Sequence, residues 1–558
     1  MSIELNALDL EIAWSRIASI ADEADANVMR TAFSSIIRDS HDYSCAIYDA
    51  RGNLLSQPGF VTPGHMGGMS AAMKTLGDIY PFESLQDGDM IITNDPWIMS
   101  GHLPDIMVTA PVFLRDKLVA FAACVFHHQD IGGHLGIDNR EIFEEGLQIP
   151  PCMLYRQGQE NEDIYRIIGQ NVRVPDLVVN DIRSQVATLH FTADRIRLFM
   201  QEKDFDSLEP LADEIYDRTE TALRKAVREI PDGVYEAECQ VEGGEGEDRI
   251  TLRLRLEVTD GDIIADFEGT EGKVDRGINC VLNYTVAYCV FALKSIVAPF
   301  LPSNAGTMRP FTVRAPEGSI LNVKPPASVV GRTSIGQYVP ELVYSALSSV
   351  LPERVIAESG SLPLWWLTLS GQRRDGRAFV IGPMFSGGLG ARHGSDGKSA
   401  LTFPANIKNS PVEMIESDSP LLVERRQLVP DSAGVGRYRG GYGQEFVLRV
   451  PNDDTAPDGA VVNFLLAGRM DEGAKGLDGA GAGIAGAVEH NGRAIGWGKP
   501  HLLHPGDRIV YRTAGGGGYG DPALRDADLV RKELRDGLIT EAVAQQTYGL
   551  DVGKDNLE

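Results

Sequence analysis

Apolar side chains recur every three or four residues near the start of the chain, and acidic residues separate them. This spacing places the apolar positions on one face of a helix. The sequence therefore predicts a single amphipathic helix over residues 6–33. Its apolar face consists of Leu8, Ile12, Ile17, Ile20, Ala24 and Val28.

The pattern changes to alternation after this helix, which is typical of β-strands. Residues 43–48 and 54–55 flank a turn and predict a hairpin, and residues 89–93 and 107–113 predict two further strands. Residues 118–126 are almost all apolar, so we expect a central strand that is buried on both faces.

Helical and alternating segments follow one another along the rest of the chain without a fixed repeat. This order favours an α+β protein with mixed and antiparallel sheets over a regular βα alternation. We expect three parts, residues 1–230, 231–425 and 426–558, because a Pro-Asp-Gly turn at 231–233 and the onset of glycine-rich turns mark the boundaries. The predicted segments are a helical stretch over 160–229, an antiparallel sheet over 234–268, a buried helix over 284–298, short strands with glycine turns over 430–520, and two short helices over 525–550.

Composition and charge exclude several classes of protein. The 558 residues include 52 Lys and Arg against 79 Asp and Glu, a formal net charge of −27. An acidic chain without a basic block is repelled by nucleic acid and by anionic lipid. The chain has no apolar run of membrane-spanning length and no secretory signal, and its six cysteines form no C-x-x-C pair. We therefore expect a cytoplasmic protein with buried free thiols, and neither nucleic acid nor membrane as a partner.

Histidines and aspartates gather in the first quarter of the chain, where two segments carry most of the candidate chemistry. His102 and Asp105 are three residues apart in a loop that contains proline, and His127 and His128 directly follow the predicted central strand. A side chain at the end of a buried strand is held rigidly, as a metal ligand must be. Imidazole and carboxylate ligands together suit Mn²⁺, Fe²⁺ or Zn²⁺.

These residues also have a structural interpretation, in which the histidines cap a strand and the His-x-x-Asp pair is a loop hydrogen bond. The glycine run at 515–520 lacks the Lys-Ser or Lys-Thr of a P-loop, and the G-x-G-x-x-G match at 481–486 lacks its strand and helix, so no nucleotide site is expected. Glu144 and Glu145 are expected in a solvated turn, with a carboxylate that lines a cleft as the alternative, and the role of Arg332 stays open.

Nine ordered motifs resemble the hydantoinase B/oxoprolinase family, from about residue 6 to about residue 550. The resemblance implies a multi-part fold of that family and a B-type subunit of an ATP-dependent enzyme that opens hydantoin, N-methylhydantoin, 5-oxoproline or lactam rings. The motifs are residues 30–38, 42–48, 94–96, 101–105, 127–133, 145–151, 302–306, 432–441 and 515–522.

The resemblance also implies the partners and the cofactors. A separate hydantoinase A-type subunit would hold ATP and Mg²⁺ in a hetero-oligomer, and would phosphorylate the small cyclic amide. The present chain would carry a divalent metal (Mn, Zn or Fe) that assists hydrolysis of the phosphorylated intermediate. The ligands that correspond to the family's are Asp42, His102, Asp105 and His127.

Two further residues are candidates for catalysis because they follow His127 closely in the sequence. His128 or Asp130 is the candidate base or proton shuttle, although His128 could instead orient His127. Two alternatives to the hydrolase remain. One is a subunit of an ATP-dependent ketone carboxylase of the acetone or acetophenone type, which belongs to the same family, and the other is a structural partner without catalysis.

Overall fold

The computed structural model describes residues 6–243 and 247–550, and its first part is built on a seven-stranded sheet. Every neighbouring pair of strands in this sheet is antiparallel. The predicted hairpin and strands are confirmed, and the apolar strand lies inside the sheet with strands on both sides. The strand order is β2 (Leu54–Ser56), β1 (Tyr43–Asp49), β5 (Lys117–His127), β4 (Asp105–Leu114), β3 (Met90–Thr93), β6 (Cys152–Arg156) and β7 (Gln159–Glu160).

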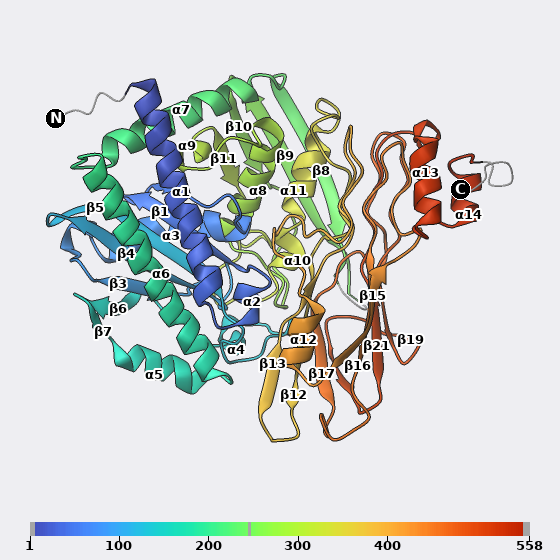
Figure 1. Ribbon diagram of the computed structural model, residues 1–558. Helices are drawn as coiled ribbons and strands as arrows, with labels where there is room; N and C mark the ends of the chain where they lie inside the picture. Colours follow the sequence, from blue (N-terminus) through green and yellow to red (C-terminus); the bar gives the residue numbers. More distant parts are fainter. Residues whose placement is uncertain (1–5, 244–246, 551–558) are drawn as a thin grey trace. The chain divides into compact units, whose positions relative to one another are not determined.

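Helices cover both faces of this sheet, which explains why its central strands are buried on both faces. Helices α1 (Ala7–Thr31) and α6 (Pro175–Glu202) lie side by side on one face (Figure 1). Helix α3 (Pro63–Ile79) contributes methionines to the core on the other face. Successive side chains of a strand point to opposite faces, so β1 is buried at every position and β5 is buried from Val119 to His127.

The predicted helical stretch over 160–229 consists of three helices. A proline stands in the first turn of α6 and another in the first turn of α7, where the missing N–H leaves no hydrogen bond unmade. A proline inside a helix would break it, so each proline begins a new helix instead. The three helices are α5 (Glu162–Asn171), α6 and α7 (Glu209–Val227).

Helix α3 was not predicted, because its glycines lower helix propensity. The structure shows that these glycines permit close contacts. A Cβ at Gly67 would lie 2.4 Å from the Cβ of Ala287 in α8 (Leu282–Val297), and one at Gly68 would lie 2.7 Å from the Ser100 nitrogen. The helix therefore approaches α8 and the loop around Ser100 at backbone distance.

A second sheet follows the helices, as the alternation over 234–268 predicted. β9 and β10 are antiparallel, β11 is added in parallel to β10, and β8 lies on the other side of β9. Helix α8, predicted over 284–298, connects this region to the short α9 (Ala305–Met308). The strand order is β11 (Phe311–Arg314), β10 (Asp262–Asp266), β9 (Ile250–Thr259) and β8 (Gly233–Val241).

Two five-stranded sheets form the C-terminal part, and aromatic side chains connect them. Trp365 from one sheet stacks on Tyr511 from the other with ring centroids 6.2 Å apart, and the ring centroid of Phe385 in the first sheet lies 4.4 Å from that of Phe446 in the second. One sheet has the order β13 (Ala378–Ile381), β12 (Trp365–Gln372), β17 (Ala460–Leu466) and β20 (Pro500–Leu503), with β14 (Met384–Phe385) beside β12; the other has the order β15 (Leu422–Leu428), β16 (Gln444–Arg449), β21 (Arg508–Arg512), β18 (Ala487–His490) and β19 (Arg493–Ala494).

The glycine run at 515–518 lies in the interior of this part. A Cβ at Gly516 would lie 2.2 Å from the Leu389 carbonyl oxygen, so only glycine fits. The N–H groups of Gly516 and Gly517 donate to the carbonyls of Gly441 and Glu358, both at 2.9 Å. Because these donors are engaged within the chain, the run packs backbone against backbone and is no phosphate-binding loop.

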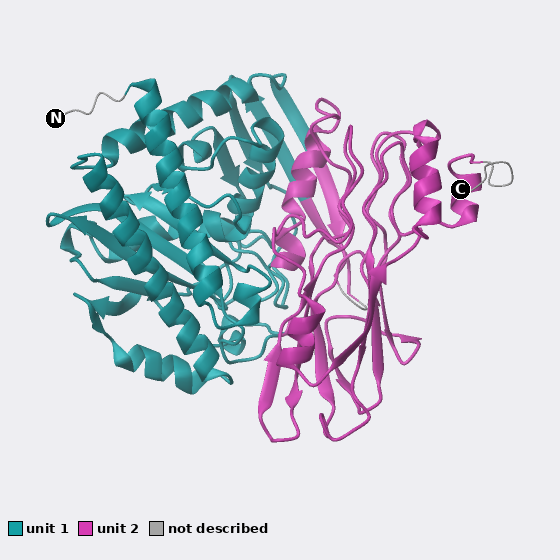
Figure 2. Ribbon diagram, viewed as in Figure 1, with its two compact units in different colours: residues 1–135, 139–236, 253–332 teal, residues 136–138, 237–252, 333–558 magenta. Residues whose placement is uncertain are grey.

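The chain divides into two compact units (Figure 2). One comprises residues 1–135, 139–236 and 253–332, and the other comprises 136–138, 237–252 and 333–558. The three-part division stays a prediction. Among the described residues, no helix is long and apolar enough to cross a membrane. The remaining helices are α2 (Ser35–Arg38), η1 (Phe82–Ser84), α4 (Ile142–Glu145), α10 (Thr333–Gly336), α11 (Val339–Leu347), α12 (Val412–Asp418), η2 (Pro522–Leu524), and the predicted terminal pair α13 (Ala527–Arg535) and α14 (Glu541–Gln546).

The six cysteines form no disulfide in the structure. Cys45, Cys124, Cys280 and Cys289 are buried, as predicted, whereas Cys152 and Cys239 are half-buried. Burial raises the pKa of each buried or half-buried thiol for which a shift is resolved, including those of Cys124 and Cys289. A thiol with a raised pKa is a poor nucleophile, so these cysteines contribute packing.

Candidate metal centre

Three neighbouring strands bring the candidate ligands to one end of the first sheet. Asp105 begins β4 and His127 ends β5, and the register pairs these two residues directly. Asp42 immediately precedes β1, and its carbonyl accepts the His127 N–H at 3.0 Å. The antiparallel pairing therefore places the start of one strand beside the end of the next, which joins residues that are distant in sequence.

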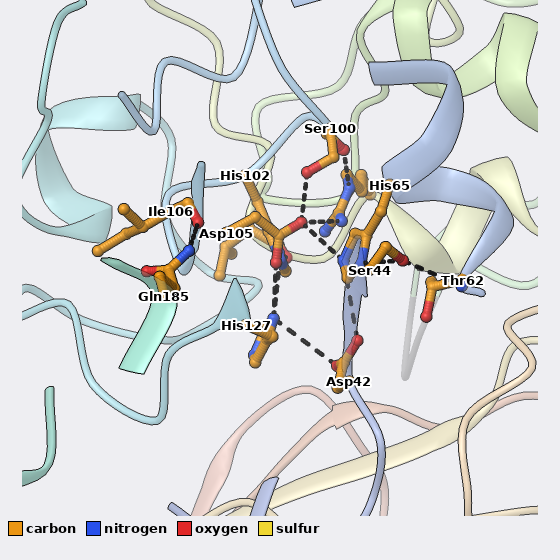
Figure 3. Close-up of polar contacts among 12 residues, drawn as sticks. Asp42, Ser44, Thr62, His65, Ser100, His102, Asp105, Ile106, His127 and Gln185 are labelled. Carbon is orange, nitrogen blue, oxygen red and sulfur yellow. Dashed lines mark hydrogen bonds and ion pairs between the residues drawn. The ribbon is translucent and has the colours of Figure 1, made fainter. Parts of the chain in front are cut away.

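His102, Asp105 and His127 converge on one point (Figure 3). His102 Nε2 lies 2.8 Å and His127 Nδ1 lies 2.9 Å from Asp105 Oδ1, and the two nitrogens are 3.1 Å apart. All three side chains are buried, and their potential ligand atoms lie within 4.8 Å of one another. This is an arrangement in which two imidazoles and one carboxylate could hold a metal ion.

The hydrogen bonding of His102 supports a cation at this point. Its Nδ1 lies 3.0 Å from the Val330 carbonyl oxygen, which can only accept, so Nδ1 carries the proton. Burial, together with the charge of Arg332, lowers the pKa of His102 to about 3, so the ring is neutral and Nε2 is a lone pair. That lone pair faces the ionised Asp105 oxygen at 2.8 Å. Two acceptors this close repel each other unless a cation lies between them.

Asp42 and His65 border this cluster (Figure 3). Asp42 Oδ2 lies 3.8 Å from His127 Nδ1, farther than the contacts within the three-residue cluster. His65 comes from α3 and lies 3.7 Å from Asp42 Oδ1 and 3.4 Å from Asp105 Oδ2. The structure therefore joins three of the four predicted ligands closely and places the fourth at the edge of the cluster.

The second oxygen of Asp105 has its own partners. Ser100 donates its hydroxyl to Asp105 Oδ2, and Arg332 Nη2 donates to the same oxygen at 2.8 Å. Burial alone would raise the pKa of Asp105, but the groups around it, Arg332 among them, hold it well below its usual range. Asp105 is therefore a carboxylate despite its complete burial.

His128, the first predicted catalytic residue, is buried beside the cluster and contacts α6. Its Nε2 lies 3.4 Å from Gln185 Oε1, whose amide donates to two backbone carbonyls. Gln185 can thus only accept from His128, which places the proton on Nε2 and the lone pair on Nδ1. Burial lowers the pKa of His128 to about 4, so the imidazole is neutral.

Asp130, the second predicted catalytic residue, organises the loop after β5. Its carboxylate accepts the backbone N–H of Gly132 at 2.9 Å and a guanidinium N–H of Arg173 at 2.9 Å, and the backbone N–H of Arg173 donates to it as well. These contacts hold the loop against the connection between α5 and α6.

Glu145 was expected in a solvated turn, and that expectation is wrong. The residue is completely buried, and its Oε1 accepts hydrogen bonds from the Ser328 hydroxyl and from the Val329 and Val330 N–H groups. Burial raises the pKa of Glu145 to about 7. Since the Val330 carbonyl holds His102 Nδ1, Glu145 supports the loop that orients this histidine.

Sequence reasoning missed His65, Ser100 and Arg332 as neighbours of the centre. The glycine-rich stretch around His65 concealed its helix. Ser100 and His102 share a loop, but no spacing rule relates a serine to a carboxylate five residues later. Arg332 is 227 residues from Asp105, so only the fold could join the pair.

A family model described as hydantoinase B/oxoprolinase matches residues 6–522 of the chain. A protein of Pseudomonas sp. (strain NS671), provisionally named as the B-type subunit of a D-/L-hydantoinase, is 31% identical over 583 residues. The match covers 98% of this chain and 96% of that protein. The similarity therefore extends over almost the whole of both chains.

Two solved structures have the same fold. The ATP-dependent caprolactamase from Pseudomonas jessenii superimposes with a TM-score of 0.90 and 26% identity, over 99% of this chain and 98% of that chain. A nucleotide-free acetone carboxylase superimposes with a TM-score of 0.84 and 19% identity, over 97% and 79% respectively. The first match confirms the predicted α+β fold, and the second shows the fold alone.

Proposed function

The chain belongs to the hydantoinase B/oxoprolinase family, and on that basis we propose that it is the B-type subunit of an ATP-dependent hydrolase of cyclic amides. Its substrate is a hydantoin, N-methylhydantoin, 5-oxoproline or lactam ring. The observation that carries this proposal is the convergence of His102, Asp105 and His127 at adjoining strand ends. The ATP-dependent caprolactamase, which shares the fold, supports the reaction class.

His102, Asp105 and His127, with Asp42 at their edge, fit one divalent ion such as Mn²⁺, Zn²⁺ or Fe²⁺. The fit rests on the lone pair of His102 that faces a carboxylate oxygen, and on a donor set of imidazole and carboxylate. When bound, such an ion polarises a carbonyl and lowers the pKa of water toward neutrality.

The chain's own residues prepare the site for this chemistry. The Val330 carbonyl keeps the proton of His102 on Nδ1, so Nε2 always faces inward. The His128 lone pair on Nδ1 makes no hydrogen bond in the structure, which suits a residue that accepts a proton during hydrolysis. Asp130 holds the loop that carries both His127 and His128, and a direct part for it in proton transfer stays a prediction.

An A-type partner supplies ATP, bound with Mg²⁺, and phosphorylates the amide oxygen of the substrate. The Pseudomonas relative is named as one of the subunits of its enzyme, which supports a complex of two kinds of chain. The glycine run of this chain uses its N–H groups internally, so phosphate binding falls to the partner. The proposed complex is a hetero-oligomer.

The test is to co-express the chain with its A-type partner and to assay ring opening with ATP. The substrates are hydantoin, N-methylhydantoin, 5-oxoproline and ε-caprolactam, with acetone and bicarbonate as a carboxylase arm. We expect ATP-dependent ring opening that His102→Ala abolishes. The matched control, His190→Ala, changes an exposed histidine of α6 and should keep full activity.

The outcomes of this assay distinguish the hydrolase from its alternatives. ATP-dependent carboxylation of the ketone without ring opening would replace the hydrolase with a carboxylase. Turnover that His102→Ala leaves unchanged, in an intact complex, would show that this centre takes no part in the reaction. Metal analysis of the wild type should find about one divalent ion per chain.

A further inference from the structure

Arg332 is a buried arginine at the metal centre whose guanidinium contacts three groups. Nη2 donates to Asp105 Oδ2 at 2.8 Å, and Nε donates to the Ser100 carbonyl at 2.5 Å. The guanidinium carbon lies 4.5 Å from the centre of the Tyr284 ring. A planar group that is bonded at two of its nitrogens and stacked on a ring has one orientation available.

The surroundings of Arg332 leave little room for it to move. A Cβ at Gly101 would lie 2.8 Å from Arg332 Cδ, so a glycine is needed for the side chain to pass. The backbone carbonyl of Arg332 accepts from the Cys280 thiol at 3.0 Å. The arginine is therefore fixed at both its backbone and its side-chain end.

This fixed guanidinium divides the two oxygens of Asp105 between different partners. Oδ1 faces His102 and His127 at 2.8 and 2.9 Å. Oδ2 accepts hydrogen bonds from Arg332 and Ser100 and lies 3.4 Å from His65 Nε2. Both hydrogen bonds to Oδ2 must break before this oxygen can turn toward an ion held by the histidines.

We propose that Arg332 is a positioning residue that restricts Asp105 to coordination through one oxygen and thereby selects the cation. This inference rests on the proposed metal site. Ca²⁺ takes six to eight oxygen ligands and often uses both oxygens of a carboxylate. One carboxylate oxygen with two imidazole nitrogens instead suits Mn²⁺, Fe²⁺ or Zn²⁺. Arg332 therefore disfavours Ca²⁺ by withholding Oδ2.

A simpler role for Arg332 would be purely electrostatic. A positive charge near the site weakens the binding of every divalent cation by a similar factor, because Mn²⁺ and Ca²⁺ carry the same charge. The ratio of the two dissociation constants cancels this contribution. A change in the ratio therefore reports on the oxygen that Arg332 holds and not on its charge.

The experiment measures Mn²⁺ binding from the electron paramagnetic resonance signal of free Mn²⁺, and Ca²⁺ binding by competition, on metal-stripped full-length protein. We expect Arg332→Gln to lower the ratio of the Ca²⁺ to the Mn²⁺ dissociation constant at least tenfold. Ser100→Ala removes only the second hydrogen bond to Oδ2 and should lower the ratio about threefold. This milder variant keeps the test decisive if Arg332→Gln does not fold.

The matched control is Arg469→Gln. Arg469 is likewise buried, bonded to a carboxylate (that of Glu341) and placed over a tyrosine ring, but it belongs to the other compact unit. It should leave the ratio unchanged. A ratio that is the same in Arg332→Gln, Ser100→Ala and wild type would overturn the role of Arg332. If the wild type bound no Mn²⁺ at this site, the proposed metal centre itself would fail.

Discussion

Replacing Glu145 by glutamine should remove one component of the pH dependence of stability. Glutamine has the shape of the protonated acid, and its oxygen can accept the same three hydrogen bonds from Ser328, Val329 and Val330. The variant therefore keeps the contacts and loses only the titration. The comparison with the wild type therefore isolates the free energy of placing a carboxylate charge in the protein interior.

The magnitude follows from the pKa, which burial raises from 4.5 to about 7. A group with a raised pKa in the folded state stabilises the protein fully below its unfolded pKa and loses that stabilisation as the pH rises through the folded value. A difference of this size corresponds to about 3 kcal/mol over the whole range, of which about 2.5 kcal/mol falls between pH 5 and pH 8.

The assay is urea unfolding of the wild type and of Glu145→Gln at pH 5, 6, 7 and 8, with chelator present so that no cation contributes. The unfolding free energy of the wild type, relative to the variant, should decrease steadily over this range. Glu144→Gln is the control, because Glu144 is the exposed neighbour in the same short helix. If the difference between wild type and Glu145→Gln did not change with pH, the pKa of Glu145 would be the same in the folded and unfolded states, and burial would not raise it.

Three further outcomes are expected from single substitutions. His127→Ala should reduce the bound divalent ion from about one per chain to almost none in elemental analysis, with an unchanged circular dichroism spectrum; retained metal would refute the ligand set. Asp105→Asn leaves the buried charge of Arg332 without its carboxylate and should lower the unfolding free energy in chelator by about 3–5 kcal/mol, and a loss below about 1 kcal/mol would contradict the ion pair. Gly516→Ala places a Cβ 2.2 Å from a backbone oxygen and should destabilise by roughly 3 kcal/mol or more in urea unfolding, whereas Gly59→Ala, with no atom within 4 Å, should have almost no effect.

Local patterns were sufficient for most elements of the fold. The spacing of apolar residues predicted α1, the alternation predicted β1 to β4 and β8 to β10, and the run at 118–126 predicted β5, whereas β6, β7 and β11 were not predicted. These features depend on neighbouring residues, because a helix or strand must bury one face or both. The same reasoning failed for α3, where glycines that serve close packing against α8 disguised the helix.

Local sequence patterns also predicted some of the candidate ligands. His102 and Asp105 are near neighbours, and His127 ends a strand that the pattern predicted. The motifs of the family added Asp42. None of these observations gives the distances between the side chains. The convergence of His102, Asp105 and His127 became evident only from the structure, in which β4 pairs with β5.

Contacts between residues that are far apart in sequence could be learned only from the folded chain. Arg332 reaches Asp105 across 227 positions, and Glu145 reaches the loop at 328–330 across more than 180. Burial, which raises the pKa of Glu145 and lowers that of His102, depends on every element packed around these groups. The periodicity of neighbouring residues thus specifies the helices and strands. The register of the strands and the burial of ionisable side chains depend instead on how distant elements pack together.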